Sequence, residues 1–340
     1  MLFKNYVRIS IFVWLAVLLV GASATVVYRL EPLHGDLTRL GWKSEYLFGP
    51  NISESYFENA ISKRATLGDY YDVVVIGDSF SNTEPFASLW HNYLSENTGL
   101  SVGVFHLSQL DLCTYLKSKE FSETPPLFLI YQTVERAMKS RLSNPMCVGA
   151  SVATYQGDVV KKTVASTQVQ SISHSRDKNP YINIGYGLKF YYRQLFPTKD
   201  VVVQEMTVTD LFSNRHSDKI LFYKDDLLKK SWTATDWKEM SRTLFSLGQI
   251  VEANAYTKFI PLVANDKSSA YRAFIEHTNT SIYENLEFFR EDNYEILEVS
   301  RFVEDSIKSG AVDFYNPNNT HWSASGNRLV GAKVSSLLVK

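Results

Sequence analysis

The stretch that most constrains the fold is a β-branched run that ends in a tight polar turn. Val73–Ile76 is unbroken, and Gly77-Asp78-Ser79 follows it directly. Such a run is typical of a strand buried on both faces of a parallel sheet. A helical pattern follows over Pro85–Asn97, so the turn joins a strand to a helix. The sequence therefore predicts an α/β fold with Ser79 at the carboxyl end of a central strand, where open α/β sheets bind ligands.

This turn has two interpretations. Free backbone N–H groups at a helix start can hold a developing oxyanion, which makes Ser79 a candidate nucleophile. Alternatively, Asp78 or Ser79 only caps the helix. A histidine partner that takes the serine proton would separate the two interpretations.

Such a histidine lies near the other end of the chain, in Asn316-Pro-Asn-Asn-Thr-His-Trp-Ser323. His321 sits in a polar loop before a predicted helix, Ala324–Leu338, for which Ser323 is a suitable cap. Histidine is the usual base for a serine hydroxyl. An ordinary loop or core histidine is the alternative.

The order of these two motifs, Gly-Asp-Ser-Phe after the first strand and Thr-His-Trp-Ser-x-x-Gly before the last helix, resembles the SGNH hydrolase superfamily. The residues of the two motifs are most similar to those of its alginate O-acetyltransferase-like branch, which consists of periplasmic enzymes that acylate polysaccharides. The resemblance covers roughly residues 72–340. It implies a three-layer, flavodoxin-like parallel sheet flanked by helices.

The resemblance also implies a function and partners. It implies an acyl-Ser79 intermediate, with His321 as general base, and transfer to a polysaccharide hydroxyl. A membrane-bound O-acyltransferase would supply the acyl group. A carbohydrate esterase of the same fold and a catalytically inactive polysaccharide-binding or assembly protein are the alternatives.

Two expected oxyanion donors differ from the family pattern. The glycine that usually follows the second strand, here Leu100–His106, is absent, which leaves a backbone group such as that of Ser108. After the third strand, Leu127–Tyr131, Gln132 takes the place of the expected Asn and could donate from its amide. Gln132 could instead cap the next helix.

The residue that should orient His321 also differs, because Asn318 and Asn319 stand where the pattern has Asp. Three alternatives remain open. Asn319 could orient a Ser79–His321 dyad, or Asp313 could fold back to serve as the acid. The third alternative is a binding domain without turnover.

Further candidates lie at the same rim of the sheet. Asp266 and Lys267 follow a predicted strand, Phe259–Val263, and related acyltransferases carry a lysine in a comparable segment. For Lys267 itself, however, its place in a polar loop favours a solvated loop charge over a role in the site. Arg136, after the third strand, and Trp322, beside His321, complete this group.

The amino terminus predicts a membrane segment. Lys4 and Arg8 precede Ile9–Tyr28, which is apolar and long enough to cross a bilayer as a helix. The basic residues place the amino terminus in the cytoplasm and the rest outside. Ala22-Ser23-Ala24 could be a signal-peptidase site, but the apolar run continues beyond it and favours an uncleaved anchor. With the resemblance, this predicts a single-pass protein of a bacterial inner membrane with its domain in the periplasm.

Residues 1–29 are therefore the predicted anchor or signal sequence, 30–70 an irregular lead-in, and 71–340 the domain. The alternation of predicted strands and helices is interrupted at about 143–232. This interruption predicts an insertion with a hairpin strand over Val201–Val208. Its tyrosines could stack on sugar rings or simply pack: Tyr181, Tyr186, Tyr191 and Tyr192. An amphipathic helix follows at Asp236–Ala255, capped by Thr233 or Thr235.

Charge and cysteine content argue against nucleic-acid binding and against a zinc or redox site. The net charge of −1 gives no electrostatic footprint for nucleic acid. Cys113 and Cys147 are the two cysteines, and they could form a disulfide outside the cytoplasm or remain free thiols. No Cys-x-x-Cys pair exists, so we expect neither a zinc nor a redox site, and no cofactor.

Overall fold

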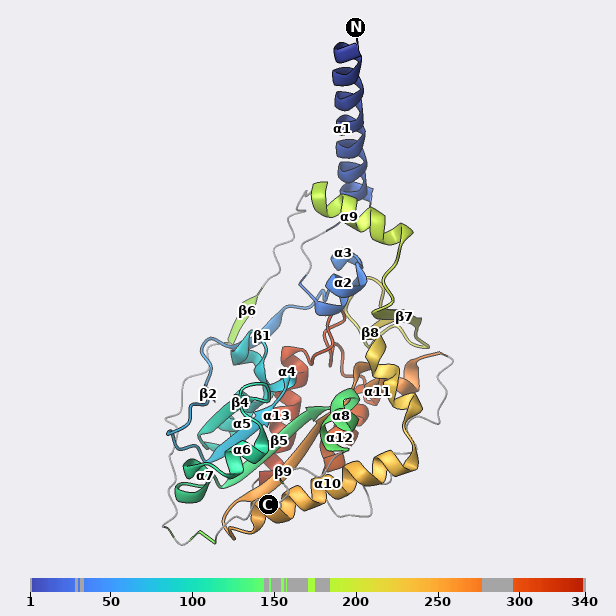
Figure 1. The fold of residues 1–340 in the computed structure, drawn as a ribbon. Helices are drawn as coiled ribbons and strands as arrows, with labels where there is room; N and C mark the ends of the chain where they lie inside the picture. Colours follow the sequence, from blue (N-terminus) through green and yellow to red (C-terminus); the bar gives the residue numbers. More distant parts are fainter. Residues whose placement is uncertain are drawn as a thin grey trace.

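A five-stranded parallel sheet with helices on both faces forms the centre of the computed structural model (Figure 1). The structure describes residues 2–27, 30, 34–143, 147, 154–155, 157, 171–174, 184–276 and 296–338. The strand order is β2-β4-β3-β5-β9. These strands are β2 (Lys63–Arg64), β3 (Val73–Gly77), β4 (Val102–His106), β5 (Phe128–Val134) and β9 (Lys258–Ala264).

Alternate side chains of the strands pack into two apolar cores, one on each face of the sheet. Val73 and Val75 of β3 face one core, which includes the helices α5 (Trp90–Thr98), α12 (Ile296–Lys308) and α13 (Ala324–Leu338). Val74 and Ile76 face the other. That second core holds α6 (Leu112–Leu116), α7 (Lys119–Glu123), α8 (Met138–Leu142) and α10 (Ala234–Glu252). Because both faces are covered, the central strands read as continuous hydrophobic runs.

The predicted strands are confirmed, but β5 is longer than expected. It continues through Gln132 to Val134 because β9 pairs with it as far as Val134 and Ala264. Gln132 therefore lies within a strand and caps no helix. The strand is followed by the 3₁₀ turn η2 (Glu135–Ala137).

The helix predicted over Pro85–Asn97 is divided into two pieces. A 3₁₀ turn, η1 (Phe86–Ser88), is separated from α5 by Leu89, whose backbone is extended. The Asn92 side chain donates to Phe86 O at 2.7 Å and so stabilises this break. The two later helices form as predicted: a Thr233–Asp236 capping box opens α10, and Ser323 Oγ accepts from Gly326 N at 3.1 Å at the start of α13.

The lead-in segment contains short regular elements where an irregular chain was expected. These are α2 (Asp36–Gly41), α3 (Glu45–Phe48), β1 (Glu54–Phe57) and β2. They are too short to show a periodic pattern. The described part of the insertion packs on them: β1 pairs with β6 (Ser171–His174), and the hairpin of β7 (Val201–Glu205) and β8 (Lys219–Tyr223) packs against α2 and α3.

The hairpin predicted at Val201–Val208 is therefore present, although its strand ends at Glu205. Tyr181 and most of the polar part of the insertion lie outside the described residues. The remaining elements are α4 (Ser79–Asn82), α9 (Ile184–Leu195), η3 (Lys224–Ser231), α11 (Lys267–Ala270) and η4 (Arg272–Phe274).

The amino-terminal helix α1 (Leu2–Val27) projects away from the domain (Figure 1). Its segment Phe3–Val27 is long and apolar enough to cross a membrane, as an anchor or as a signal sequence. Near its carboxyl end α1 packs against α9, which lies across it (Figure 1).

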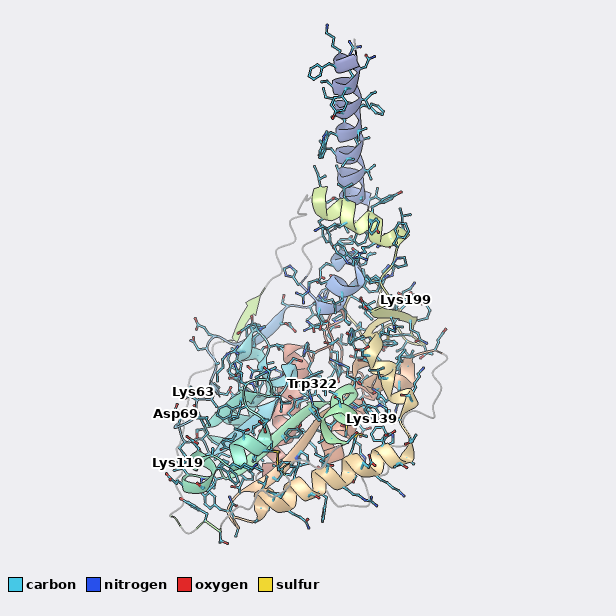
Figure 2. The ribbon with its side chains drawn as sticks, viewed as in Figure 1. Lys63, Asp69, Lys119, Lys139, Lys199 and Trp322 are labelled. Atoms are coloured by element: carbon cyan, nitrogen blue, oxygen red, sulfur yellow. A yellow bond between two sulfur atoms is a disulfide. The ribbon has the colours of Figure 1, made fainter. Side chains whose placement is uncertain are left out.

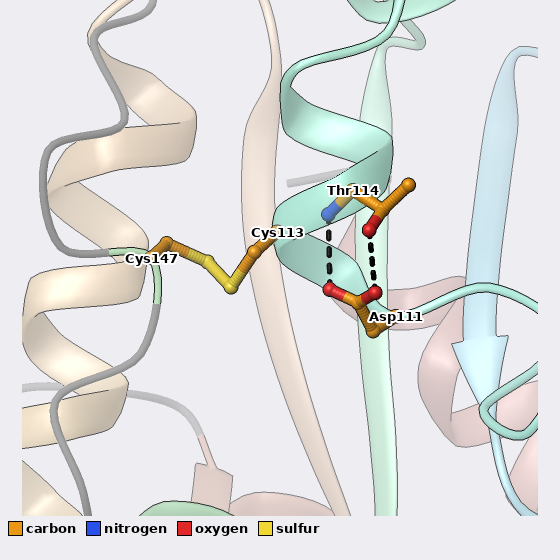
Figure 3. Close-up of a disulfide and its surroundings, with 4 residues drawn as sticks. All are labelled: Asp111, Cys113, Thr114 and Cys147. Carbon is orange, nitrogen blue, oxygen red and sulfur yellow. Dashed lines mark hydrogen bonds between the residues drawn. A yellow bond between two sulfur atoms is a disulfide. The ribbon is translucent and has the colours of Figure 1, made fainter.

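The two cysteines form a disulfide. Cys113 of α6 and Cys147 have Cα atoms 5.0 Å apart and close a loop of 34 residues (Figure 3). Figure 3 also shows Asp111, which caps α6 by accepting from Thr114 N at 2.9 Å. The bond therefore ties the chain after α8 to the helix that follows β4.

Candidate active site

Ser79 stands at the first position of α4, directly after β3, as the strand-turn-helix pattern predicts. Gly77 is needed at the end of β3 because a Cβ there would lie 2.7 Å from Gln132 Oε1 and 2.8 Å from Ser81 Oγ. Asp78 is the helix cap, accepting from Phe80 N at 3.1 Å. Ser79 is partly exposed, and its hydroxyl is left for another partner.

Asp78 and Gln132 form the frame that holds this turn. Asp78 Oδ1 accepts from Gln132 Nε2 at 2.9 Å, while Oδ2 accepts from Val134 N at 2.7 Å and Arg141 Nη1 at 2.6 Å. Gln132 Oε1 in turn accepts from Asp78 N and from Ser81 Oγ, both at 2.9 Å. Gln132 thus braces the turn, with one of the two N–H groups of its amide donating to Asp78, and its oxyanion role stays a prediction.

His321 is carried by a short loop that folds back on itself. A bridge between Tyr315 and Trp322 closes the loop, and Asn316 N donates to His321 O at 3.2 Å. Trp322 lies inside the domain (Figure 2), where its ring meets Phe80 edge-on with 4.9 Å between centroids. Trp322 is therefore a core residue that anchors the loop against α4.

The loop and the turn bring the two motif residues together. His321 Nε2 lies 2.8 Å from Ser79 Oγ, and His321 Nδ1 lies 2.7 Å from Asn319 Oδ1. The backbone N–H of His321 also donates to Asn319 Oδ1, at 3.1 Å, which fixes the amide with its oxygen toward the ring. An amide oxygen only accepts, so Nδ1 carries the proton and Nε2 is free to accept the serine proton. This is the tautomer that a general base requires.

Asp36 is a site residue that the sequence reasoning missed. Its carboxylate accepts from Thr320 N at 2.9 Å and from Thr320 Oγ1 at 2.5 Å, and Oδ2 lies 3.7 Å from His321 Nδ1. The distance is too long for a hydrogen bond but short enough for a charge interaction. The loop therefore has a nearby carboxylate, although it comes from the lead-in.

The lead-in contacts the histidine loop at several further points. Leu37 N donates to Asn318 O at 3.0 Å, and the Asn318 amide donates to Glu45 Oε1. A Cβ at Gly35 would lie 2.0 Å from Asn318 O, so only glycine allows this close approach. Asn318 thus anchors the lead-in, while Asn319 serves His321.

Lys267 holds the loop from the other side. Its side chain is buried, and Nζ donates to the carbonyl oxygens of Asn316 and Pro317 at 2.8 Å and of Asn319 at 3.2 Å. Burial lowers the pKa of Lys267 to about 7, against the opposing effect of nearby carboxylates, Asp36 foremost. The lysine is therefore a positioning residue, and the expectation of a solvated loop charge is wrong.

Burial and nearby carboxylates also have opposite effects on the pKa of His321. Burial lowers the pKa of His321 below its ordinary value, and the Asp36 carboxylate opposes that shift. A lowered pKa keeps the imidazole neutral, and so able to act as a base, at neutral pH.

The other predicted site residues are engaged with partners other than Ser79 and His321. Ser108 N donates to His106 Nδ1 at 3.1 Å, so this backbone group is engaged. Asp313 accepts from Ser213 N at 2.8 Å and from Ser213 Oγ, and it does not fold back to His321.

Arg136 and Asp266 belong to a buried ion network behind the site. Arg136 Nη1 lies 2.7 Å from Asp266 Oδ1, and Asp266 Oδ2 lies 2.5 Å from Lys229 Nζ. Asp226 and Glu135 complete the network, and burial beside Asp266 raises the pKa of Asp226. These groups compensate one another's charge and brace the carboxyl ends of β5 and β9.

Within the described residues, no group of three or more His, Cys, Asp or Glu side chains could hold a metal ion. The groups that the structure brings together at Ser79 are a serine hydroxyl, an imidazole, an amide oxygen and a nearby carboxylate. Compared with known proteins, the chain matches no family model, no curated protein and no solved structure.

Proposed function

We propose that this protein is an exported, membrane-anchored O-acyltransferase that transfers an acyl group, in the simplest case acetyl, to a polysaccharide hydroxyl. One observation carries the proposal. Ser79 Oγ lies 2.8 Å from a His321 nitrogen whose tautomer is fixed by Asn319. A serine with a correctly protonated histidine in hydrogen-bond reach is the arrangement of an activated nucleophile.

In the proposed reaction, His321 Nε2 takes the Ser79 proton as Oγ attacks the carbonyl carbon of the donor ester. The tetrahedral intermediate collapses, and the leaving alkoxide takes the proton back from Nε2. The acceptor hydroxyl then loses its proton to Nε2 and attacks acyl-Ser79. When that second intermediate collapses, Ser79 recovers its proton.

The imidazolium that forms in each step is stabilised by the Asp36 carboxylate at 3.7 Å, while Asn319 keeps the ring oriented. Asp36 and Asn319 together thus supply the two functions of the Asp that the histidine motif lacks. An Asn in the same place of a serine protease is harmful because it imposes the wrong tautomer. Here the His321 backbone N–H holds the amide oxygen toward Nδ1 and supports the right one.

The fold supports the resemblance to SGNH enzymes. The nucleophile candidate follows the central strand of a parallel sheet, and the histidine loop precedes the last helix. Of the expected oxyanion donors, the Ser108 N–H donates to His106, and one of the two N–H groups of the Gln132 amide donates to Asp78. We assign the first donor to the Ser79 backbone N–H, at the start of α4.

A cavity beside the histidine loop, with both apolar and polar side chains in its lining, is the proposed acceptor site for a sugar. It measures about 300 Å³ and borders the histidine loop at Asn316 and Ser323. Charged and hydroxyl side chains of Glu54, Ser325 and Arg328 line it further. Such groups suit the hydroxyls of a sugar, and the volume falls in the range of small-molecule sites.

The amino terminus and the disulfide support the cellular setting. α1 is apolar enough to cross a bilayer, and the basic residues in its first two turns, Lys4 and Arg8, favour a cytoplasmic amino terminus. The Cys113–Cys147 disulfide suits an oxidising compartment such as the periplasm. A membrane-bound O-acyltransferase is the proposed acyl donor.

The proposal is tested by the fate of an aryl acetate. The full-length protein in detergent or vesicles is incubated with the ester and a mixture of envelope oligosaccharides, and the products are separated by mass spectrometry. Acetylated oligosaccharide, absent with Ser79→Ala, is the expected result. Release of acetate alone would instead identify an esterase. Failure of a folded wild-type protein to release any phenol would contradict both activities.

A further inference from the structure

The helix α9 has an apolar stripe that continues beyond its contact with α1. Ile184 and Leu188 pack against Gly21 of α1, where a Cβ on Gly21 would lie 2.6 Å from Ile184 and 3.1 Å from Leu188. Tyr191 and Leu195 follow at the spacing that places them on the same helix face. The stripe therefore starts on α1 and runs on past it.

Beyond α1 the stripe is exposed. Tyr191, Tyr192, Leu195 and Phe196 are 43%, 55%, 59% and 59% exposed, and they form one group at the end of α9. Exposed apolar residues gathered in this way mark a contact surface. Lys189 and Arg193 lie among them, which gives the helix a basic component.

The position of α1 indicates that this surface contacts the lipid membrane. Only 17% of the apolar window of α1 is buried in the protein, so its sides face outward. Between Ile9, the first residue after the basic Lys4 and Arg8, and Val27 the helix is about 27 Å long at 1.5 Å per residue, close to the thickness of a bilayer's hydrocarbon core. α9 crosses α1 near its carboxyl end (Figure 1), where Gly187 lies against Gly21 and Thr25, about 9 and 3 Å inside the end of this span at 1.5 Å per residue. This is close to the depth of a helix that lies in the membrane interface, at the boundary with the lipid headgroups.

The composition of α9 also suits that level. Tyrosines and phenylalanine at a membrane boundary place their rings among the headgroups, and basic side chains attract anionic lipid. Figure 2 shows Lys199, a few residues after α9, on this side of the domain, whereas Lys119 lies toward the opposite end.

We propose that α9 lies in the membrane interface with its Tyr191–Phe196 surface against anionic lipid and so sets the height of the catalytic domain above the bilayer. The proposal rests on the proposed membrane anchor. Contacts connect α9 to the active site: Gln194 Nε2 donates to Trp42 O at 3.2 Å, and Thr198 Oγ1 donates to Leu40 O at 3.0 Å. Both acceptors lie at the carboxyl end of α2, whose first residue is Asp36.

The connection is short. α2 has six residues, about 9 Å at 1.5 Å per residue. Figure 1 shows α2 and α3 between α9 and the end of the sheet where α4 begins. An interfacial α9 thus holds Asp36 and His321 on the side of the domain nearest the bilayer, where a membrane-embedded donor presents its acyl group.

The test measures membrane depth with single cysteines in the full-length protein. The native cysteines are bonded to each other, so an introduced cysteine is the available thiol. Tyr192→Cys and Phe196→Cys carry a bimane fluorophore. Leu15→Cys in α1 serves as the membrane reference, and Leu228→Cys, an exposed apolar position on η3, is the matched control. Vesicles contain phosphatidylglycerol and lipids with spin-labelled acyl chains.

We expect the lipid quencher to reduce the fluorescence at positions 192 and 196 at least twofold and to leave position 228 unchanged. Position 15 should be quenched most strongly. Quenching at 15 without quenching at 192 and 196 would overturn the interfacial helix and leave the anchor in place. An unquenched or cleaved α1 would overturn both. Aryl acetate turnover by each labelled variant verifies that it is folded.

Discussion

Asp36 Oδ2 lies 3.7 Å from His321 Nδ1, although the two residues come from opposite ends of the chain. Asn319 accepts the hydrogen bond from the same nitrogen. In the reaction that we propose, the two tasks that one aspartate performs in a Ser-His-Asp triad, orienting the ring and stabilising its charge, are divided between an amide and a more distant carboxylate.

Removing the Asp36 charge should change both the rate and its pH dependence. The base form of His321 is neutral, and burial holds its pKa below 6.5, so the acid limb of kcat/KM should have its midpoint below 6.5. Asp36 raises that pKa, so Asp36→Asn should move the acid limb to still lower pH. The plateau should fall about tenfold, equal to about 1.4 kcal/mol of lost imidazolium stabilisation. The pH–rate profile with an aryl acetate measures both effects.

Thr320→Val is the control for this variant. It removes the hydroxyl that Asp36 accepts from but keeps the carboxylate, so its acid limb should not move to lower pH. An Asp36→Asn profile that coincides with that of the wild type would contradict the electrostatic role.

Asn319 should matter through its oxygen. Asn319→Ala removes the acceptor that fixes the tautomer of His321, and kcat/KM should fall by about 10²- to 10⁴-fold, the range of a general base. Asn319→Asp keeps the acceptor and adds a charge, so its kcat/KM should equal or exceed that of the wild type. Steady-state kinetics check both.

The neighbouring Asn318→Ala separates ring orientation from loop packing. Its amide donates to Glu45 and does not reach His321, so the rate should fall by less than about tenfold. If the losses caused by the two alanine variants were equal, Asn319 would have no special role.

Lys267 should stabilise the histidine loop. Lys267→Met keeps much of the side chain but leaves three carbonyl groups, one buried and two half-buried, without their donor. The free energy of unfolding should fall by about 1–3 kcal/mol, the cost of unsatisfied buried polar groups. Urea denaturation measures it. The exposed Lys238→Met on α10 should change it by less than about 0.5 kcal/mol, and an equal loss in both variants would rule out the loop contact.

The disulfide should stabilise the domain through the loop that it closes. Replacing Cys113 and Cys147 together by Ser frees a loop of 34 residues. The free energy of unfolding should fall by about 2–4 kcal/mol. Comparison with the reduced wild-type protein is the control. A change below about 0.5 kcal/mol in both would contradict this contribution.

Local patterns were sufficient to predict much of the fold and the central pair of the site. The β-branched run before Ser79 is typical of a buried strand, and the polar loop before α13 carries His321. The length of β5 was not predictable from its own residues, because its pairing with β9 extends it through Gln132. As a result, Gln132 braces Asp78 from within the sheet.

The missed residues depend on contacts between distant segments. Asp36 lies in a short helix with no periodic pattern, and it reaches His321 only because Gly35 allows the lead-in to approach Asn318. Lys267 looked like a loop charge, since no sequence pattern shows that three carbonyl groups of the histidine loop surround it. Such tertiary contacts require the fold itself.

The most direct test of the central claim is the intact mass of the full-length protein after brief incubation with an aryl acetate. Wild type, Ser79→Ala and His321→Ala are measured side by side, each verified as folded. The account predicts one added acetyl group on the wild type, mapped to Ser79, and none on either variant. A folded wild-type protein that gains no acetyl and releases no phenol would contradict it, as would an adduct that persists in Ser79→Ala.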